Sequence, residues 1–391
     1  MAVGIVTEFN PLHNGHIIHI NETRERLDNK KIIAVMSGNF VQRGEPAVVD
    51  KFKRTKMALM AGVDVVIELP AVFCLGGADY FARGAVGLLE ATGIVTDISF
   101  GTECGDIGVI FTAASILADE PESFRMKLRQ GLSLGLSFAA AQKNALQHCM
   151  ENAPEDVFKR PNNTLAIEYI KALILAKSST NVHATHRTQG ISATAIRKSV
   201  LTEEYIPNTL PPYVKEILEE SIIKNEIGRI NNYSQLFKFM INKENIGEMS
   251  LLSEGLENRF RKYASKHSDL YDILSAVKTK RYTFTRLLRN AMSVILGLTN
   301  NDMQMYNKNN GPQYIRVLGF KKSSEHLLGE MKKKSNLPMI TTKKDLDKIL
   351  YTKSTASKML QFELDASDVY KIAMGKNSPY RSEIGERIVI I

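Results

Sequence analysis

The sequence has only three cysteines among its 391 residues, Cys74, Cys104 and Cys149, and no two of them have the spacing of zinc ligands. Three cysteines cannot form a disulfide framework, so a reducing compartment is expected. The amino-terminal segment lacks the basic and apolar stretches of a secretory signal, and no apolar run reaches the ~18–20 residues of a membrane helix. These absences predict a cytoplasmic protein that does not enter a membrane.

The composition is that of an ordinary globular protein, with 44% apolar, 24% charged and 7% aromatic residues. These proportions exclude disordered and collagen-like chains. The net charge is +9, of which +1 belongs to residues 1–200 and +8 to the remainder. Such an asymmetry is expected for a protein with an acidic partner such as nucleic acid, although a solvated lysine-rich surface would give the same counts.

Short β-branched runs alternate with helical stretches in the first half of the chain. Strands are predicted over residues 2–6, 31–36, 63–68 and 97–101, and helices over 15–27, 52–61 and 82–91. Continuous apolar strands separated by helices predict an α/β fold with a Rossmann-like parallel sheet covered on both faces. A ligand is then expected at the loops that follow the strands.

The pattern changes to long amphipathic helices beyond about residue 205. Two strand-like patches interrupt it, at 313–320 and 339–342, and the Asn-rich residues 300–311 are predicted to form a loop. A single core stops growing near ~250–300 residues, so this length favours two domains. We expect a Rossmann-like domain over residues 1–205 and a mainly helical, basic domain over 206–391.

Two histidines follow the first predicted strand. His13 and His16 are three residues apart at the start of a predicted helix, so their imidazoles would face the same way. A helix amino terminus binds anions, and imidazoles there would donate hydrogen bonds to phosphate oxygens. Surface histidines without a function are the alternative for so short a motif. A metal site is not predicted, because no cysteine or carboxylate cluster accompanies the histidines.

The string H-x-G-H at this junction resembles the signature of the nucleotidylyltransferase superfamily. Enzymes of that superfamily attack the α-phosphate of ATP and release pyrophosphate, and a second basic motif holds the leaving phosphates. The segment ISATAIR at residues 191–197, with two hydroxyl groups and Arg197 at the start of a predicted helix, resembles that second motif.

Longer motifs resemble those of one family within this superfamily, the tRNA(Met) cytidine acetate ligases. They are VGIVTEFNPLHNGH at residues 3–16, MSGNFVQRGEPA at 36–47, ELP at 68–70, FGTE at 100–103, PNN at 161–163 and KTKRYT at 278–283. The resemblance implies that ATP and acetate form acetyl-adenylate and pyrophosphate. The acetyl group would then pass to N4 of the wobble cytidine of elongator tRNA(Met). Mg²⁺ is expected to accompany ATP.

The resemblance also implies a set of site residues. His13 and His16 would stabilise the transition state at the α-phosphate, with Arg197 at the leaving phosphates. Ser37, Gly38, Asn39 and Arg43 are expected near acetate or the cytidine. The implied ATP-binding residues are Val6, Thr7, Glu8, Phe9, Asn10, Pro11, Leu12, His13, Asn14, Gly15, His16, Ile17, Ile18, His19, Gly101, Asn162, Arg187, Thr188, Ser192 and Thr194.

A basic segment with an aromatic residue lies in the second half. Lys278, Lys280, Arg281, Tyr282 and Arg286 are expected to bind the tRNA, because basic side chains neutralise phosphates and a tyrosine stacks on an unpaired base. A solvated helix face is the alternative for this segment. Two other functions fit the first motif: a nucleotidylyltransferase acting on a small phosphorylated metabolite, and an RNA-binding protein that has retained an old nucleotide pocket.

Overall fold

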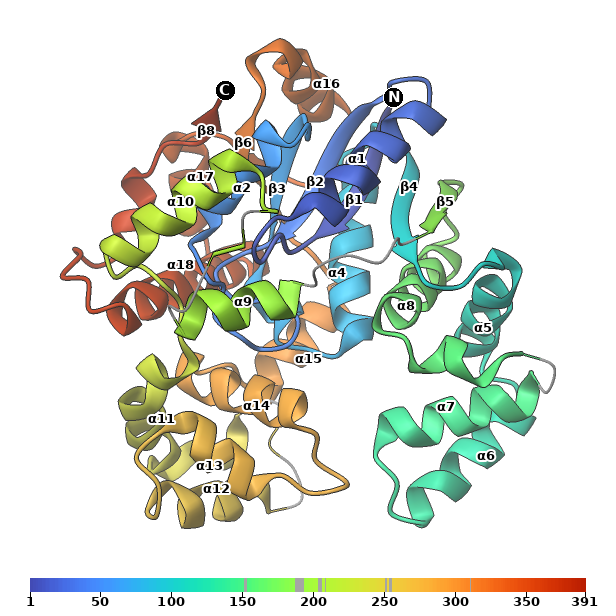
Figure 1. The fold of residues 1–391 in the computed structure, drawn as a ribbon, viewed down its shortest axis with the longest axis vertical. Helices are drawn as coiled ribbons and strands as arrows, with labels where there is room; N and C mark the ends of the chain where they lie inside the picture. Colours follow the sequence, from blue (N-terminus) through green and yellow to red (C-terminus); the bar gives the residue numbers. More distant parts are fainter. Residues whose placement is uncertain are drawn as a thin grey trace.

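A single sheet forms the centre of the molecule, built from strands of both halves of the chain (Figure 1). The computed structural model describes residues 1–150, 153–186, 193–202, 206–207, 209–249, 252, 255–309 and 311–391. The strands are β1 (Ala2–Thr7), β2 (Lys31–Ser37), β3 (Val65–Leu69), β4 (Val95–Thr102), β5 (Asn181–His186), β6 (Ile315–Phe320), β7 (Met339–Ile340) and β8 (Val389–Ile390).

The strand order is β5-β4-β1-β2-β3-β6-β7, with β8 beside β6. The strands from β5 to β3 in this order pair in parallel, whereas β6 runs antiparallel to β3. The predicted α/β fold with a mainly parallel sheet is therefore confirmed. The chain builds β2 and β3 on one side of β1 and then crosses to the other side for β4 and β5, so the strand order reverses between β1 and β4.

Helices account for most of the remaining ordered chain. They are α1 (Asn14–Arg26), α2 (Lys51–Met60), α3 (Ala71–Cys74), α4 (Ala78–Ala91), α5 (Ile107–Asp119), α6 (Glu122–Ser133), α7 (Phe138–Cys149), α8 (Pro161–Leu175), α9 (Ala193–Thr202), α10 (Pro212–Ile223), α11 (Ser234–Ile241), α12 (Leu256–Ala264), α13 (Leu270–Val277), α14 (Phe284–Leu296), α15 (Asn300–Lys308), α16 (His326–Lys334), α17 (Lys343–Leu350) and α18 (Thr355–Ala373). Short 3₁₀ turns include η2 (Ile230–Tyr233) and η5 (Ser382–Gly385).

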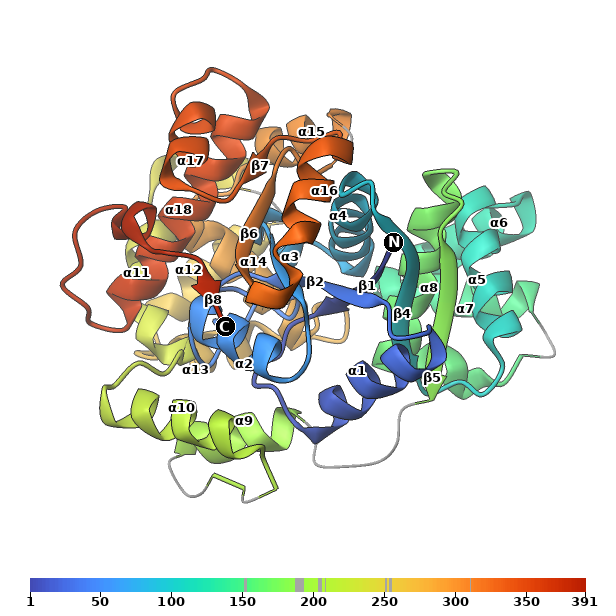
Figure 2. The same ribbon diagram turned by 90° about the horizontal axis from the view of Figure 1, so that it is seen from above.

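Apolar side chains cover both faces of the sheet. Successive residues of a strand point to opposite faces, so in β2 Ile33 and Val35 join one apolar core while Ile32 and Ala34 join the other. The first core includes residues of α4 and α8, and the second includes residues of α1, α2, α9 and α10. Figure 2 shows α1, α9 and α10 on one side of the sheet and α4 on the other.

Two helical groups extend from the same end of the molecule (Figure 1). One consists of α5, α6 and α7, inserted between β4 and β5, and the other of α11 to α14. Helices α11, α12, α13 and α14 pack on one another through buried residues such as Phe237 and Phe260, whose ring centroids are 5.3 Å apart. No helix of the described ranges is long and apolar enough to cross a membrane.

The chain returns to the sheet after the second helical group. Strand β6 is buried along its whole length and pairs with β3, and β7 and β8 pair with β6. The predicted division at residue 205 must be corrected, because strands from beyond it complete the sheet of the first half. The Asn-rich loop predicted for residues 300–311 is also wrong. Most of it forms α15, which begins with a capping box between Thr299 and Asp302.

Candidate active site

A cavity of about 590 Å³ opens where the strand order reverses, at the carboxyl ends of β1, β4 and β5. Ligands bind at this point in open α/β sheets, because the loops after neighbouring strands diverge there. The residues that line the cavity come from the end of β1, from α1, from the loop between β2 and α2, and from α4, β4, α8, β5 and α9.

His13 and His16 lie side by side at the amino terminus of α1. His13 is the N-cap: its Nδ1 accepts a hydrogen bond from the Gly15 N–H (3.1 Å), and His16 Nδ1 accepts one from the His13 N–H (3.2 Å). The two rings are stacked with centroids 3.8 Å apart. Because each Nδ1 accepts a hydrogen bond, each neutral ring carries its proton on Nε2. The start of the helix thus carries two imidazole N–H groups on residues that line the cavity.

Gly15 lies close to one of these rings. A Cβ atom at this position would lie 3.0 Å from Cε1 of His13, so a larger residue would push against the capping ring. His19, one turn further along α1, hydrogen-bonds Ser99 Oγ through Nε2 at 3.1 Å. Burial lowers the pKa of His19 to about 4, so this ring is neutral at pH 7.

Arg197 of α9 reaches the same cavity from a distant part of the sequence. Its Nη1 donates to the carbonyl oxygen of Asn10 (3.0 Å), its Nη2 to Thr194 Oγ1 (3.3 Å), and its Nε forms an ion pair with Glu45 (3.2 Å). The fold therefore brings the second predicted motif against the first. Glu45 is a charged neighbour of Arg197 that sequence reasoning missed, although it belongs to the quoted motif at residues 36–47.

The opposite wall of the cavity is formed by the end of β4 and the start of α8. Asn162 Nδ2 donates to Glu103 Oε1 at 2.6 Å, which fixes the amide against the end of β4. A Cβ atom at Gly101 would meet no atom within 4 Å, so the backbone there faces open space. Phe100 and Tyr169 add apolar surface to this wall. Sequence reasoning also missed Glu103. Its place in the FGTE motif is the only feature of the sequence that could have pointed to it.

The structure brings most of the predicted ATP-binding residues to this cavity. Among the predicted residues, Leu12 is buried in the core and Asn14 donates to the carbonyl oxygen of Thr209 (2.6 Å). Pro11 and Ile17 do not line the cavity either, and Arg187, Thr188 and Ser192 lie outside the described residues. The predicted residues that line it are Val6, Thr7, Glu8, Phe9, Asn10, His13, Gly15, His16, Ile18, His19, Gly101, Asn162 and Thr194.

Ser37, Gly38 and Asn39 do not line the cavity, contrary to the expectation for acetate or cytidine, whereas Arg43 does. The Arg54 guanidinium donates to the carbonyl oxygens of Ser37 and Gly38. Asn39 Oδ1 accepts from the Lys51 N–H (2.9 Å), and its Nδ2 donates to Ser367 (3.3 Å). These three residues therefore belong to the buried interior.

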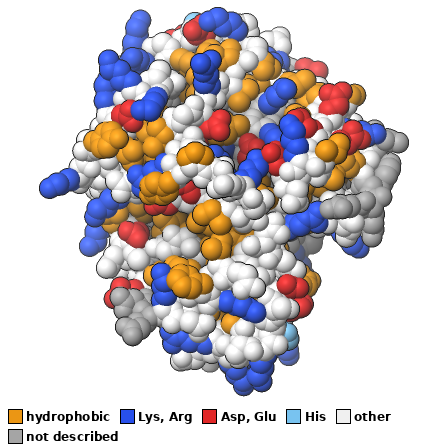
Figure 3. All heavy atoms as spheres, turned by 90° about the vertical axis from the view of Figure 1, so that its left-hand side faces the viewer, with side chains coloured by type: hydrophobic (Ala, Val, Ile, Leu, Met, Phe, Trp, Pro, Cys, Tyr) orange, Lys and Arg blue, Asp and Glu red, His pale blue; other side chains and the backbone are white. Residues whose placement is uncertain are grey.

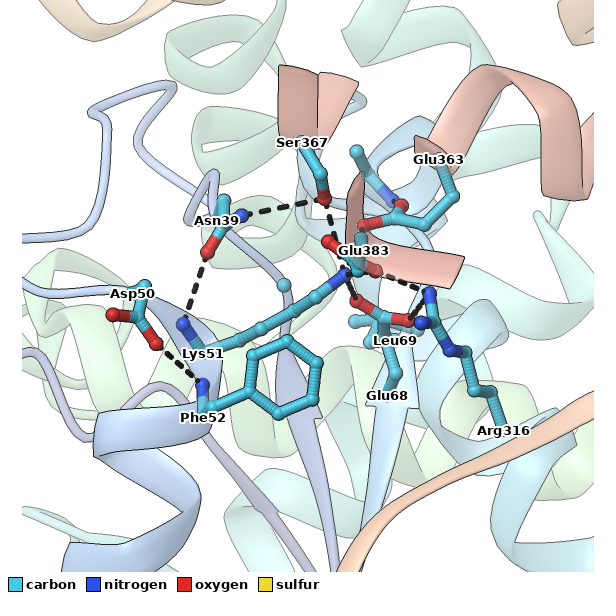
Figure 4. Close-up of polar contacts among 12 residues, drawn as sticks. Asn39, Asp50, Lys51, Phe52, Glu68, Leu69, Arg316, Glu363, Ser367 and Glu383 are labelled. Atoms are coloured by element: carbon cyan, nitrogen blue, oxygen red, sulfur yellow. Dashed lines mark hydrogen bonds and ion pairs between the residues drawn. The ribbon is translucent and has the colours of Figure 1, made fainter. Parts of the chain in front are cut away.

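Figure 4 shows the charged network that they border. Lys51 Nζ contacts the carboxylates of Glu68, Glu363 and Glu383, and Arg316 contacts those of Glu68 (3.1 Å) and Glu383 (2.6 Å). Burial and the nearby Glu68 raise the pKa of Glu363 well above its ordinary value, while Lys51 and Arg316 overcome burial and lower that of Glu383 to about 2. The network attaches α18 and η5 to the start of α2 and to strands β3 and β6.

The predicted tRNA-binding segment lies in the loop between α13 and α14 and in the first turn of α14. Lys278, Lys280 and Arg281 are exposed. Tyr282 is 9% exposed, and the Arg286 guanidinium lies 5.0 Å from the centre of its ring. The expected stacking of Tyr282 on a base does not fit this arrangement, because the tyrosine ring is already covered.

Relatives of known name share this architecture. The profile of the HIGH nucleotidyl transferase family matches residues 1–383. A Thermoanaerobacter sp. (strain X514) protein named tRNA(Met) cytidine acetate ligase is 40% identical over 356 residues, which cover 87% of this chain and 88% of that protein. The chain belongs to this ligase family. A Halothermothrix orenii protein of the same name is 38% identical over 372 residues, with 88% and 87% of the two chains covered.

Solved structures of the family have the same fold. The crystal structure of Thermotoga maritima TmcAL bound with alpha-thio ATP has a TM-score of 0.91 and 35% identity, over the whole of both chains. Its apo form has a TM-score of 0.92 and 34% identity. Within the described ranges of the present chain, no group of three or more His, Cys, Asp or Glu side chains is arranged to hold a metal ion.

Proposed function

We propose that this chain is an ATP-dependent ligase that forms acetyl-adenylate from acetate and ATP and transfers the acetyl group to N4 of the wobble cytidine of elongator tRNA(Met). The observation that carries the proposal is the stacked pair His13 and His16 at the start of α1. The pair faces a cavity at the reversal of strand order, and Arg197 reaches the same cavity. The relatives named as this ligase support the choice of substrates.

In the first step a carboxylate oxygen of acetate attacks the α-phosphorus of ATP, and pyrophosphate leaves. Acetate is itself the nucleophile, so the protein needs only to position the reactants and stabilise charge. The two Nε2–H groups of His13 and His16 donate to the α-phosphate oxygens as charge develops on them. Arg197, with Thr194 beside it, holds the leaving pyrophosphate.

The nucleoside occupies the side of the cavity next to β4 and α8. Gly101 leaves its backbone open to the ligand, Asn162 supplies an amide fixed by Glu103, and Phe100 and Tyr169 offer apolar contact. Arg187, Thr188 and Ser192 are assigned to the same ligand by resemblance. Mg²⁺ enters with the ATP, since this ion prefers phosphate and water oxygens to a dedicated protein site, and it neutralises phosphate charge.

Acetate and the cytidine approach from the opposite side, where Arg43 lines the cavity and its guanidinium would attract the acetate carboxylate. The same loop touches α14, because a Cβ atom at Gly44 would lie only 2.7 Å from the Arg289 backbone nitrogen. Helix α14 follows the exposed Lys278, Lys280 and Arg281, to which we assign the tRNA backbone. The loop of Arg43 and Gly44 thus lies between α14 and the cavity.

Charge alone does not define the tRNA surface. Figure 3 views the side of the molecule on which α10, α11, α17 and α18 lie in Figure 1. Lysine and arginine side chains are scattered over this face among acidic and apolar ones. The loop between α13 and α14 is preferred because it precedes α14, which packs against the loop of Arg43 and Gly44, and Arg43 lines the cavity. A tRNA substrate places the enzyme in the cytoplasm.

The test is transfer of radiolabelled acetate to purified elongator tRNA(Met), followed by nucleoside analysis, together with acetate-dependent exchange between ATP and pyrophosphate. Label in N4-acetylcytidine that requires ATP is the expected result. Exchange that depends on a phosphorylated metabolite instead of acetate would establish the small-molecule transferase. Binding of tRNA without any nucleotide turnover would leave only the RNA-binding function.

A further inference from the structure

Several carboxylates line the cavity, although both proposed substrates of the first step are anions. They are Glu8, Glu22, Glu45 and Glu103. Each uncompensated negative charge in such a site weakens the binding of ATP and acetate. Glu45 is compensated by its ion pair with Arg197. Glu103 accepts a hydrogen bond from the Asn162 amide and lies on the nucleoside side of the cavity, at the end of β4. Glu22 lies about two turns beyond His16 on α1, away from the reacting phosphate.

Glu8 is the remaining carboxylate of the four. It follows β1 directly and is held from two sides. Its Oε1 accepts the Gln42 N–H at 2.7 Å, and its backbone carbonyl accepts Arg54 Nη1 at 2.7 Å. No ion pair within 4.0 Å joins its carboxylate to a cation among the described residues. The Gln42 N–H thus fixes the side chain at the cavity while Arg54 holds the backbone, and the carboxylate can still interact with a ligand.

The second proposed step requires a group of this kind. When N4 of cytidine attacks the acetyl carbon, a new N–C bond forms, the bond from that carbon to the phosphate oxygen breaks, and AMP leaves with its electron pair. The nitrogen becomes positively charged as it attacks and must lose one proton. A carboxylate near it stabilises the positive charge and accepts the proton.

We propose, on the basis of the function proposed above, that Glu8 is the general base of acetyl transfer, accepting the N4 proton of the incoming cytidine. Its place between the two sides of the cavity fits this role. The nucleoside wall after β4 lies on one side of β1, and the loop of Gln42, Arg43 and Gly44, which touches α14, lies on the other. The cytidine arriving along this loop meets Glu8 before it reaches the adenylate.

Opposing effects act on the pKa of the Glu8 carboxylate. Burial raises its pKa, although the Gln42 N–H and the Arg197 charge act in the opposite direction. The pKa values of the buried Cys74 and Tyr169 are raised, so neither group ionises near pH 7. The groups that act electrostatically on or with Glu8 are Arg54 of α2, Cys74 of α3, Tyr169 of α8, Arg197 of α9 and Glu45 of the β2–α2 loop.

The experiment separates the two steps in the full-length protein. Acetate-dependent ATP–pyrophosphate exchange measures adenylate formation, and a single turnover with synthetic acetyl-adenylate and elongator tRNA(Met) measures transfer. In E8Q, we expect the transfer rate to fall by about 10²–10⁴-fold and exchange by less than about tenfold. The transfer rate of the unaltered protein should rise with pH as Glu8 loses its proton, over a range above that of an exposed glutamate, and that of E8Q should not.

Two further variants make the result specific. The side-chain amide oxygen introduced in E8Q can still accept a hydrogen bond from the Gln42 N–H, so its melting temperature should equal that of the unaltered protein. E8D should recover part of the transfer rate, together with its pH dependence. E45Q, the matched carboxylate of the same cavity, should retain the rise with pH. Equal losses of exchange and transfer in E8Q would show that Glu8 acts on ATP or its magnesium ion instead. Unchanged transfer in E8Q would remove the role outright. Absence of acetate-dependent exchange in the unaltered protein would overturn the proposed function itself.

Discussion

Arg197 donates a hydrogen bond from Nη1 to the carbonyl oxygen of Asn10 at 3.0 Å, although the two residues are 187 positions apart in the sequence. Asn10 in turn accepts the Val48 N–H through its side-chain oxygen at 2.7 Å. The strand end that precedes the histidine motif is therefore braced by α9 and by the loop before α2. This contact gives Arg197 a fixed position at the cavity before any phosphate binds.

Replacing Arg197 by alanine should lower acetate-dependent ATP–pyrophosphate exchange by about 10²–10³-fold, as expected for a lost charged donor to the leaving group. Steady-state exchange assays measure the effect. The control is Lys198→Ala on the same helix, since Lys198 is exposed and does not line the cavity. Similar losses in the two variants would show that the effect comes from α9 as a whole rather than from Arg197.

The capping of α1 by His13 and the catalytic role proposed for it should separate in two variants. Asparagine is a good N-cap residue, so His13→Asn should unfold at nearly the same urea concentration as the unaltered protein, whereas His13→Ala should lose about 0.5–2 kcal/mol. Both should lose exchange by about 10²-fold or more, because neither supplies the Nε2–H. Normal exchange in His13→Asn would contradict the assignment of this ring to the α-phosphate.

Changing Lys280 and Arg281 together to alanine should weaken tRNA binding and reduce the slope of log affinity against log salt by about 1.5. Titrations of labelled tRNA at several salt concentrations measure both quantities. The pair Lys332 and Lys333 at the end of α16 provides a control of equal charge, since both are exposed and lie in another part of the molecule. An unchanged salt slope in the Lys280/Arg281 variant would exclude this loop from the interface.

His19 should make the protein less stable in mild acid. Its pKa is about 4 in the folded protein and ~6.5 when unfolded, so the unfolded chain binds the proton first and stability falls as the pH drops from about 6.5 toward 4. The loss is at most roughly 3 kcal/mol. Urea unfolding at several pH values should show a shallower dependence in His19→Gln. His326→Gln, at an exposed position, should keep the original dependence.

Local sequence patterns are enough to predict the parallel strands and the position of the candidate site. Short apolar, β-branched runs separated by helical stretches are the pattern of buried parallel strands. His13 and His16 lie next to each other because they share one helical turn. The helix of residues 300–308 could also have been found, because Thr299 and Asp302 form a capping box that depends on local sequence alone. Such features require only neighbours along the chain.

Which polar residues face the cavity depends on contacts between distant parts of the chain. Ser37, Gly38 and Asn39 lie at the end of a strand, as residues of the cavity do, but they are buried. Arg54 donates to the Ser37 carbonyl oxygen, and the Lys51 N–H donates to Asn39. Lys51 also contacts Glu363 and Glu383, which lie more than 300 positions further along the chain. Pairing of β6 with β3 likewise joins distant segments. A buried charge requires a partner of opposite charge, and an open sheet edge is covered by another strand. The fold can supply either one from any part of the chain. Local patterns do not specify those partners.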